Sequence, residues 1–178
     1  MKVLIVVDMQ NDFISGSLGT PEAQAIVPKV AEKVNQYIAE DGVVIYTMDT
    51  HFEDYLETLE GQKLPVPHCI VNTEGWHIKD EVYHSDSEVF DKYTFGYYGL
   101  PNEILGVCGR KFGRVDVESI EFVGVCTDIC VVSNALIVKS IFRDIPIMVD
   151  GSCCAGTTPA NHEAALKVMK SCQIEVKQ

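Results

Sequence analysis

The segment that decides the fold spans residues 120–131 and reads Ile-Glu-Phe-Val-Gly-Val-Cys-Thr-Asp-Ile-Cys-Val. Its first half, residues 120–125, is a mostly apolar run of the kind found in strands buried on both faces of a parallel sheet. Thr127 and Asp128 then form a helix-opening pair, and a helical pattern follows over residues 128–142. A strand, a sharp turn and a helix in this order predict one α/β unit, with Cys130 in the first helical turn.

The same alternation recurs along the chain. Short apolar runs predict further strands at residues 3–7, 43–47 and 145–149, and we expect a shorter strand at residues 88–91 and a final strand at residues 174–176. Helical patterns lie between them, at residues 20–39, 101–107 and 159–170, and Pro28 predicts either a kink in the first of these or a helix that starts near residue 27. We therefore predict a three-layer, Rossmann-like α/β fold, with an open six-stranded parallel sheet flanked by helices. Residues 48–86 form the one long irregular region, and such a loop in a compact domain is usually functional.

Size and charge limit the class of protein. A chain of 178 residues suits a single domain over residues 1–178. The 26 acidic residues exceed the 14 Lys and Arg residues and give a formal net charge of −12, which argues against nucleic-acid or membrane partners. Seven cysteines, an odd number scattered through apolar segments, are typical of reduced thiols in the cytoplasm.

Cys130 is the candidate nucleophile. Unpaired backbone N–H groups and the positive end of the helix dipole favour a thiolate at a helix start, and the same N–H groups can hold an oxyanion. The alternative is that Cys130 is a small, buried, inert apolar residue, as free cysteines often are. Other strand ends favour the catalytic interpretation: Asp8 follows the first predicted strand and Lys92 follows the short one. Because ligands bind beyond the carboxyl ends of parallel strands, we expect an acid, a lysine and a thiol to converge there.

A second set of polar residues predicts a metal site. Asp49 and His51 follow the second strand, and their spacing places both side chains on one face of extended chain. With His68 they form a set suited to zinc, with iron or manganese as alternatives. Cys69 is a conceivable fourth ligand, but as the neighbour of His68 it is expected to point the other way and pack inward.

At this point the chain resembles a known family. The motifs are Val-Val-Asp-Met-Gln-Asn-Asp-Phe at residues 6–13, Asp-Thr-His at 49–51, Pro-His-Cys at 67–69, Asp-Lys at 91–92 and Gly-Val-Cys-Thr-Asp-Ile-Cys-Val at 124–131. In this order they resemble the isochorismatase-like cysteine hydrolases, and within them the nicotinamidase/pyrazinamidase branch. The resemblance implies an enzyme of pyridine nucleotide metabolism that hydrolyses nicotinamide to nicotinate and ammonia through a cysteine thioester. It also implies a homo-oligomer.

The resemblance also implies roles for particular residues. Asp8, Lys92 and Cys130 correspond to the catalytic triad, and the backbone N–H groups of Cys126 and Cys130 to the oxyanion hole, with a cis peptide bond between Val125 and Cys126. Asp49, His51 and His68 correspond to metal ligands whose ion holds the pyridine nitrogen. Phe13 and Val125 correspond to positions that line the substrate pocket.

Some positions depart from the branch's pattern. Thr50 stands where nicotinamidases generally carry tryptophan, and a histidine-containing stretch is replaced by Phe-Glu-Asp-Tyr at residues 52–55. Two alternatives therefore remain open. One is a family hydrolase of another small amide, an N-carbamoyl compound or a vinyl ether, and the other is a catalytically silent binding protein.

Overall fold

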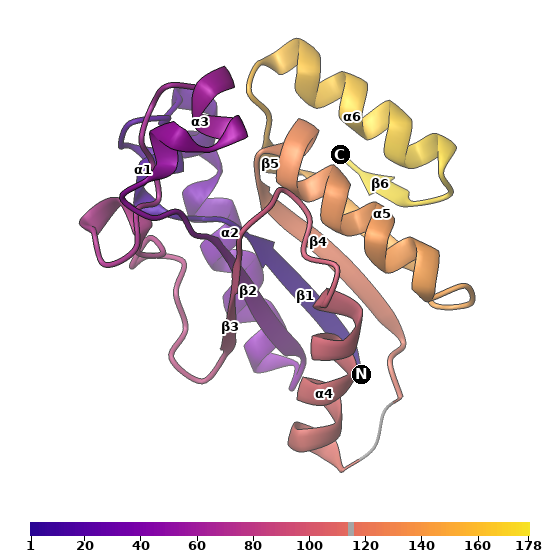
Figure 1. Ribbon diagram of the computed structural model, residues 1–178. Coiled ribbons are helices and arrows are strands. Elements are labelled where there is room, and N and C mark those ends of the chain that lie inside the picture. The colour runs from indigo at the N-terminus through magenta and orange to yellow at the C-terminus, as the bar shows by residue number, and fades with distance from the viewer. Residues whose placement is uncertain (114–115) are drawn as a thin grey trace.

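The computed structural model describes residues 1–113 and 116–178 and contains one parallel sheet (Figure 1). The six strands have the spatial order β3-β2-β1-β4-β5-β6, and each neighbouring pair is parallel. Their bounds are β1 Lys2–Val7, β2 Val43–Asp49, β3 Glu88–Lys92, β4 Ser119–Val125, β5 Ile147–Ala155 and β6 Glu175–Lys177. The predicted open, six-stranded parallel sheet is confirmed, although β5 continues further toward the carboxyl end than the apolar run at 145–149 indicated.

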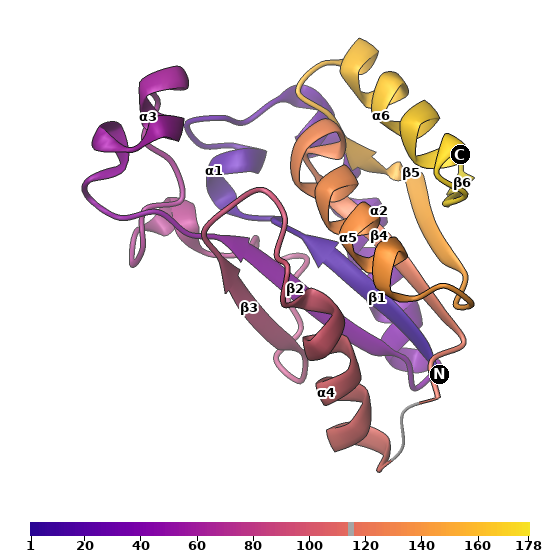
Figure 2. The same ribbon diagram turned by 45° about the vertical axis from the view of Figure 1, so that its right-hand side comes forward.

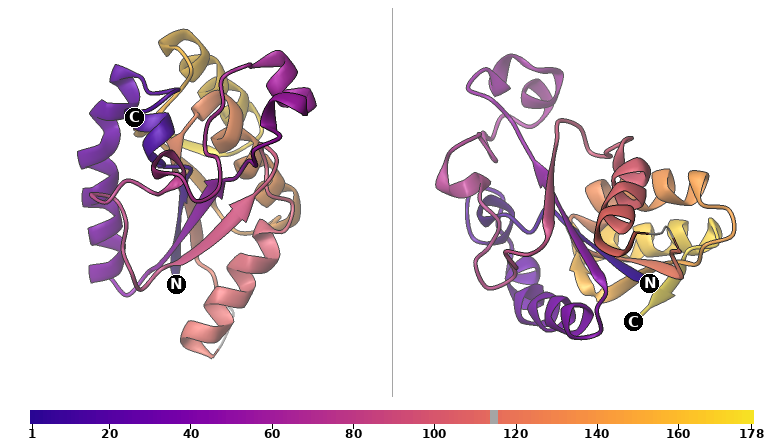
Figure 3. Two further views of the ribbon diagram at one scale, coloured as in Figure 1. Left: turned by 60° about the vertical axis from the view of Figure 1, so that its left-hand side comes forward. Right: turned by 90° about the horizontal axis from the view of Figure 1, so that it is seen from below.

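Helices cover both faces of the sheet (Figure 3). On one face lies α2, Pro21–Ala39, with the short α1, Asn11–Ile14. The other face carries α4 (Leu100–Phe112), α5 (Val132–Ile141) and α6 (Pro159–Ser171). A buried hydrophobic cluster fills the space on each face, because side chains of successive strand residues alternate between the two sides.

Local sequence signals explain the helix boundaries. Thr20 caps α2 by accepting a hydrogen bond from the Ala23 N–H, and Pro21 takes the first helical position. Thr158 and Pro159 open α6 in the same way. The helix α2 continues through Pro28, so the alternative start near residue 27 is wrong.

The long segment between β2 and β3 contains three short helices (Figure 2). They are the 3₁₀ turns η1, Tyr55–Glu57, and η2, Glu74–Trp76, and between them α3, Leu59–Lys63. Figure 2 shows α3 standing apart from the sheet, beyond the carboxyl ends of the strands. The segment therefore places side chains over the sheet edge where the candidate site lies.

Candidate active site

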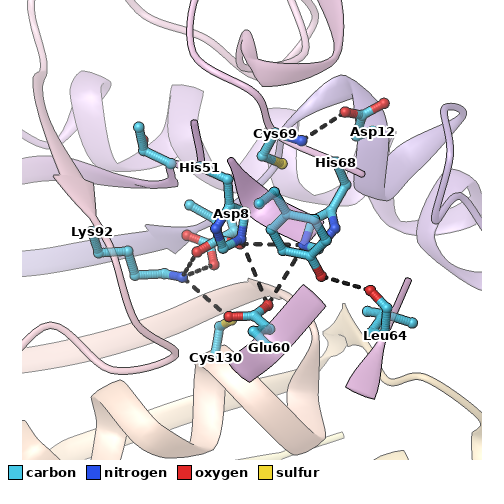
Figure 4. A network of polar contacts seen from close by, with 12 residues as sticks. Asp8, Asp12, His51, Glu60, Leu64, His68, Cys69, Lys92 and Cys130 are labelled. Atoms are coloured by element: carbon cyan, nitrogen blue, oxygen red, sulfur yellow. Dashed lines mark hydrogen bonds and ion pairs between the residues drawn. The ribbon is translucent and has the colours of Figure 1, made fainter. Parts of the chain in front are cut away.

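Strand order brings the three predicted catalytic residues together (Figure 4). The chain leaves the sheet at Asp8, directly after β1, with a left-handed backbone at φ 50°. Lys92 is the last residue of β3, and Cys130 lies in η3, Thr127–Val131, which follows β4. In the sheet, β1 lies next to β4, and only β2 separates β1 from β3. The carboxyl ends of these strands therefore place the three side chains in one buried group.

Lys92 is the centre of this group. Its Nζ lies 2.8 Å from Asp8 Oδ2, 2.9 Å from Asp49 Oδ1 and 3.4 Å from Cys130 Sγ. Thr47 Oγ1 donates a hydrogen bond of 2.7 Å to the other oxygen of Asp8. Asp8, Lys92 and Cys130 are at most 5% exposed, so their charges interact away from bulk water.

Burial and charge set the protonation of the group. Burial raises the pKa of the Asp8 carboxyl, opposed by the charge of Lys92 and reinforced by that of Asp49. Burial also raises the pKa of the Cys130 thiol well above its ordinary value; the charge of Lys92 opposes this shift, and the charges of Asp8 and Asp49 reinforce it. For Lys92, burial acts to lower the pKa, but Asp8, Cys130 and Asp49 together raise it well above its usual range. The expected shift of the Cys130 sulfur towards thiolate at a helix start is not found: burial, the largest effect, raises the pKa of the thiol.

The turn that carries Cys130 is a π-helical turn rather than the start of a regular helix. The helix predicted over 128–142 is divided into η3 and α5, and the Cys126 carbonyl accepts from both Ile129 N and Val131 N. The peptide bond between Val125 and Cys126 is cis, as the resemblance implies. Asn134, fully buried in α5, donates to the Cys130 carbonyl at 2.8 Å and accepts from Tyr97 N at 2.8 Å. The segment after Lys92 is thereby tied to the turn that holds the thiol.

A second cluster lies beside the first, and it contains the three predicted metal ligands. Donor atoms of Asp49, His51, His68 and Glu60 all lie within 4.8 Å of one another. His51 Nε2 is 3.0 Å from Asp49 Oδ2, and His68 Nε2 is 3.6 Å from the same oxygen. Glu60 Oε1 approaches His51 Nε2 to 3.6 Å from α3. Although burial acts to raise the pKa of Asp49, hydrogen bonds from both histidines and the charge of Lys92 bring it well below its ordinary value.

The chemistry of this donor set fits a divalent ion. His68 Nδ1 lies 2.8 Å from the Val66 carbonyl, a contact that requires Nδ1 to donate and so leaves the lone pair on Nε2, the nitrogen that faces the cluster. Two imidazoles and two carboxylates are a common zinc-binding combination. Cys69 is buried in the hydrophobic cluster on the α2 face and does not join these donors in the part of the chain that the structure describes.

Sequence reasoning missed Glu60. Glu60 is one of several acidic residues in an irregular segment. It reaches the two histidines only because it lies in the short helix α3, for which Thr58 is the N-cap. Nothing in the sequence spacing distinguishes Glu60 from Glu57, which the structure leaves exposed.

Gln10 and Asp12, two further residues of the motif at residues 6–13, support the cluster of candidate metal ligands. Gln10 is fully buried; its carboxamide accepts from Asp49 N at 2.8 Å and donates to Asp49 O at 2.8 Å and to Trp76 O at 2.7 Å. Asp12 Oδ2 accepts from the N–H of Cys69, next to His68, at 2.8 Å. The segment between Asp8 and Phe13 therefore fixes the backbone beside two of the candidate ligands.

Both clusters open into one cavity of about 700 Å³. Cys130, Asp49, Glu60 and His68 line it, and so do the residues expected to contact substrate, Phe13 and Val125. The Phe13 ring centroid lies 5.4 Å from that of His68. Cys126, the other expected source of an oxyanion-hole N–H, also reaches the lining.

The chain is similar to known proteins over nearly its whole length. The family model described as the isochorismatase domain matches residues 2–177. The chain is 29% identical over 188 residues to the nicotinamidase/pyrazinamidase of Mycobacterium tuberculosis, covering 99% of this chain and 98% of the relative. It is 25% identical over 205 residues to the nicotinamidase of Schizosaccharomyces pombe, covering 97% and 91%. The crystal structure of the pyrazinamidase of Pyrococcus horikoshii in complex with zinc superposes with a TM-score of 0.82 at 26% identity, covering 99% and 98%.

Proposed function

This chain belongs to the isochorismatase family, and on that premise we propose that it is a cysteine amidase that hydrolyses nicotinamide to nicotinate and ammonia. The observation that carries the proposal is the position of Lys92 Nζ, which lies 3.4 Å from the cavity-lining Cys130 Sγ and contacts the carboxylates of Asp8 and Asp49. Relatives named as nicotinamidases cover nearly the whole chain and support the choice of substrate.

The first half of the reaction uses all three buried residues. Asp8, whose pKa burial raises, takes the proton of Cys130 as the sulfur attacks the amide carbon. Lys92 keeps its proton and stabilises the sulfur as negative charge develops there. We assign the oxyanion to the backbone N–H groups of Cys126 and Cys130, and each donor of that kind is worth about 100- to 1000-fold in rate. Asp8 then passes its proton to the amide nitrogen, the C–N bond breaks, ammonia leaves, and a thioester remains on Cys130.

The second half regenerates the thiol. Asp8, ionised again after its proton has left with ammonia, draws a proton from a water molecule that attacks the thioester carbonyl. The C–S bond breaks, the sulfur recovers a proton from Asp8, and the product leaves as nicotinic acid, which loses its carboxyl proton to solvent to give nicotinate. The geometry supports this shuttle, because a side-chain hydrogen bond between Asp8 and Cys130, one of the causes of the raised pKa of the thiol, lets one proton pass directly between them.

We assign the metal site to Asp49, His51, Glu60 and His68, with zinc as the ion and iron or manganese as alternatives. A divalent ion held by these four residues would supply Lewis-acid chemistry toward the pyridine nitrogen of the substrate. Phe13, on the cavity wall beside His68, is positioned to pack on the ring face.

The described residues contain no helix long and apolar enough to cross a membrane. Cytoplasmic location and self-association stay predictions.

The proposal is tested by ammonia release from nicotinamide with purified, zinc-loaded protein. We expect Cys130→Ala to lose ammonia release to the background rate while its zinc content stays that of the unmodified protein, because the sulfur is not among the four donors. The matched control is Cys172→Ala, which removes an exposed thiol and leaves turnover intact. Turnover by Cys130→Ala within tenfold of the unmodified protein would show that another group attacks the amide.

A further inference from the structure

The cavity is larger than the proposed substrate needs. At roughly 30 Å³ per molecule of liquid water, a volume of about 700 Å³ corresponds to more than twenty water molecules. Cavities of about 300–1,000 Å³ are typical of sites for drug-sized ligands, whereas nicotinamide is a single ring with one carboxamide. Much of the cavity therefore remains unfilled when such a small ring occupies its catalytic end.

Apolar side chains from three separate segments also line the cavity. They are Leu18 and Ala23 near the start of α2, Leu59 and Leu64 at the two ends of α3, and Phe95 in the segment after Lys92. Leu59 is 78% exposed and Phe95 is 46% exposed. An apolar ligand group that covers them gains free energy in proportion to the area removed from water.

The threonines in the lining do not make this region polar, because their hydroxyls have partners in the protein. Thr20 Oγ1 accepts from Ala23 N at 3.0 Å, Thr94 Oγ1 donates to the Gly96 carbonyl at 2.8 Å, and Thr157 Oγ1 donates to Asp128 Oδ2 at 2.6 Å. Lys63 adds a cation at the exposed side of α3, where its charge can remain in water.

The chemistry of the ring limits where an additional group can be attached. With the carboxamide at Cys130 and the ring nitrogen directed to the four-donor cluster, substituents at positions 4 and 6 lie beside one of the two anchored groups, and a substituent at position 2 lies beside both. Position 5 is separated from both by a ring carbon. We propose that the site takes pyridine-3-carboxamides with an apolar substituent at position 5, and that the apolar part of the cavity binds this substituent; the inference rests on the proposed amidase function.

The test is a series of nicotinamide and its 5-methyl, 5-ethyl and 5-propyl derivatives, with kcat/KM for ammonia release measured on the unmodified, zinc-loaded protein. Burial of each added carbon is expected to raise kcat/KM by about fourfold. If nicotinamide is hydrolysed and kcat/KM stays flat or falls along the series, the inference is overturned and the amidase function stands. If only the alkyl derivatives are hydrolysed, the inference stands and nicotinamide is the wrong substrate. If none is hydrolysed, both are wrong.

A matched pair of variants assigns the effect to the cavity. Ala23→Leu adds bulk at the apolar lining, whereas Ala25→Leu adds the same bulk to an exposed position of the same helix. We expect Ala23→Leu to lower the ratio of kcat/KM for the 5-propyl derivative to that for nicotinamide by at least tenfold, and Ala25→Leu to leave the ratio unchanged. Equal ratios in both variants would place the substituent outside this cavity. If Ala23→Leu does not fold, Leu59→Ser, at a largely exposed position, replaces it and is expected to lower the same ratio.

Discussion

Asp49 is the residue that joins the two clusters of the site. Its Oδ1 lies 2.9 Å from Lys92 Nζ, and its Oδ2 lies 3.0 Å from His51 Nε2 and 3.6 Å from His68 Nε2. One carboxylate therefore balances part of the catalytic ammonium charge and forms part of the metal site. Substitution of Asp49 is therefore expected to disturb the charge balance of Lys92 and the binding of the metal together. A test of metal binding alone needs a residue that belongs only to the cluster of candidate metal ligands.

Glu60 is such a residue, because it contacts the histidines of the metal cluster from α3. We expect Glu60→Gln to weaken zinc binding by at least tenfold, since loss even of groups that only support a metal ligand costs about 10- to 100-fold in affinity. The measurement is the zinc dissociation constant of the apoprotein by chelator competition, with His51→Ala as a variant that lowers affinity further. Glu57→Gln, three residues earlier and exposed, is the control. Equal affinities for the two glutamine variants would remove Glu60 from the ligand set.

At the scale of elements, Gln10 continues the sheet where β1 stops. The ladder between β1 and β2 ends near Val7 and Thr47, because the chain turns away at Asp8. The Gln10 carboxamide then offers Asp49 one acceptor and one donor, as a backbone peptide unit of a neighbouring strand does. The Gln10 side chain thus holds the end of β2, and the main chain after β1 turns away from the sheet and places Asp8 in the site.

Gln10→Met removes these hydrogen bonds and adds no charge. Because buried backbone groups of Asp49 and Trp76 then lack a partner, we expect the variant to lose about 10- to 100-fold in zinc affinity and to lower kcat as well. Gln24→Met, at an exposed position of α2, serves as the control for the change of side chain. A variant that melts at a lower temperature but binds zinc as the unmodified protein does would contradict the positioning role.

At the scale of the whole molecule, a buried ionic network stabilises the face of the sheet under α2, away from the catalytic thiol. Glu121 of β4 accepts from Tyr37 OH at 2.7 Å and from Lys177 Nζ at 2.9 Å, and Lys33 Nζ lies 3.3 Å away. Lys33 also pairs with Asp150 of β5. The network joins α2 to β4, β5 and β6, so it connects elements that are far apart in the chain.

This network makes stability depend on pH. Burial acts to raise the pKa of Glu121, but the hydrogen bonds from Tyr37 and Lys177 and the charge of Lys33 lower it below its ordinary value of 4.5. Because the folded pKa is below the unfolded one, Glu121 stabilises the fold fully above pH 4.5, and this contribution disappears as the pH falls through the folded pKa. We expect Glu121→Gln to lower the free energy of unfolding at pH 7 by on the order of 3 kcal/mol. In urea titrations across the acid range, the difference from the unmodified protein is expected to shrink below pH 4.5, and a constant difference would contradict this account.

The predictable part of the structure follows from patterns along the chain. Apolar runs that end in a polar residue predict the parallel sheet, and the strand ends place Asp8, Lys92 and Cys130 in one group. Glu60 could not be selected in this way, because it lies in an irregular segment whose path the sequence does not determine. Gln10 could not be selected either, because side-chain hydrogen bonds to the end of β2 and to Trp76 leave no pattern along the chain. The raised pKa of the Cys130 thiol was also missed. Its first cause is the complete burial of the sulfur, which the position of Cys130 at a helix start does not reveal.

The most direct test of a covalent bond to Cys130 is the partition of products in the presence of hydroxylamine. A thioester intermediate reacts with either water or hydroxylamine, so we predict that nicotinohydroxamate forms at the expense of nicotinate while total nicotinamide consumption keeps its rate or rises. Nicotinate as the sole product at an undiminished rate, however high the hydroxylamine concentration, would contradict the thioester and with it the role assigned to Cys130.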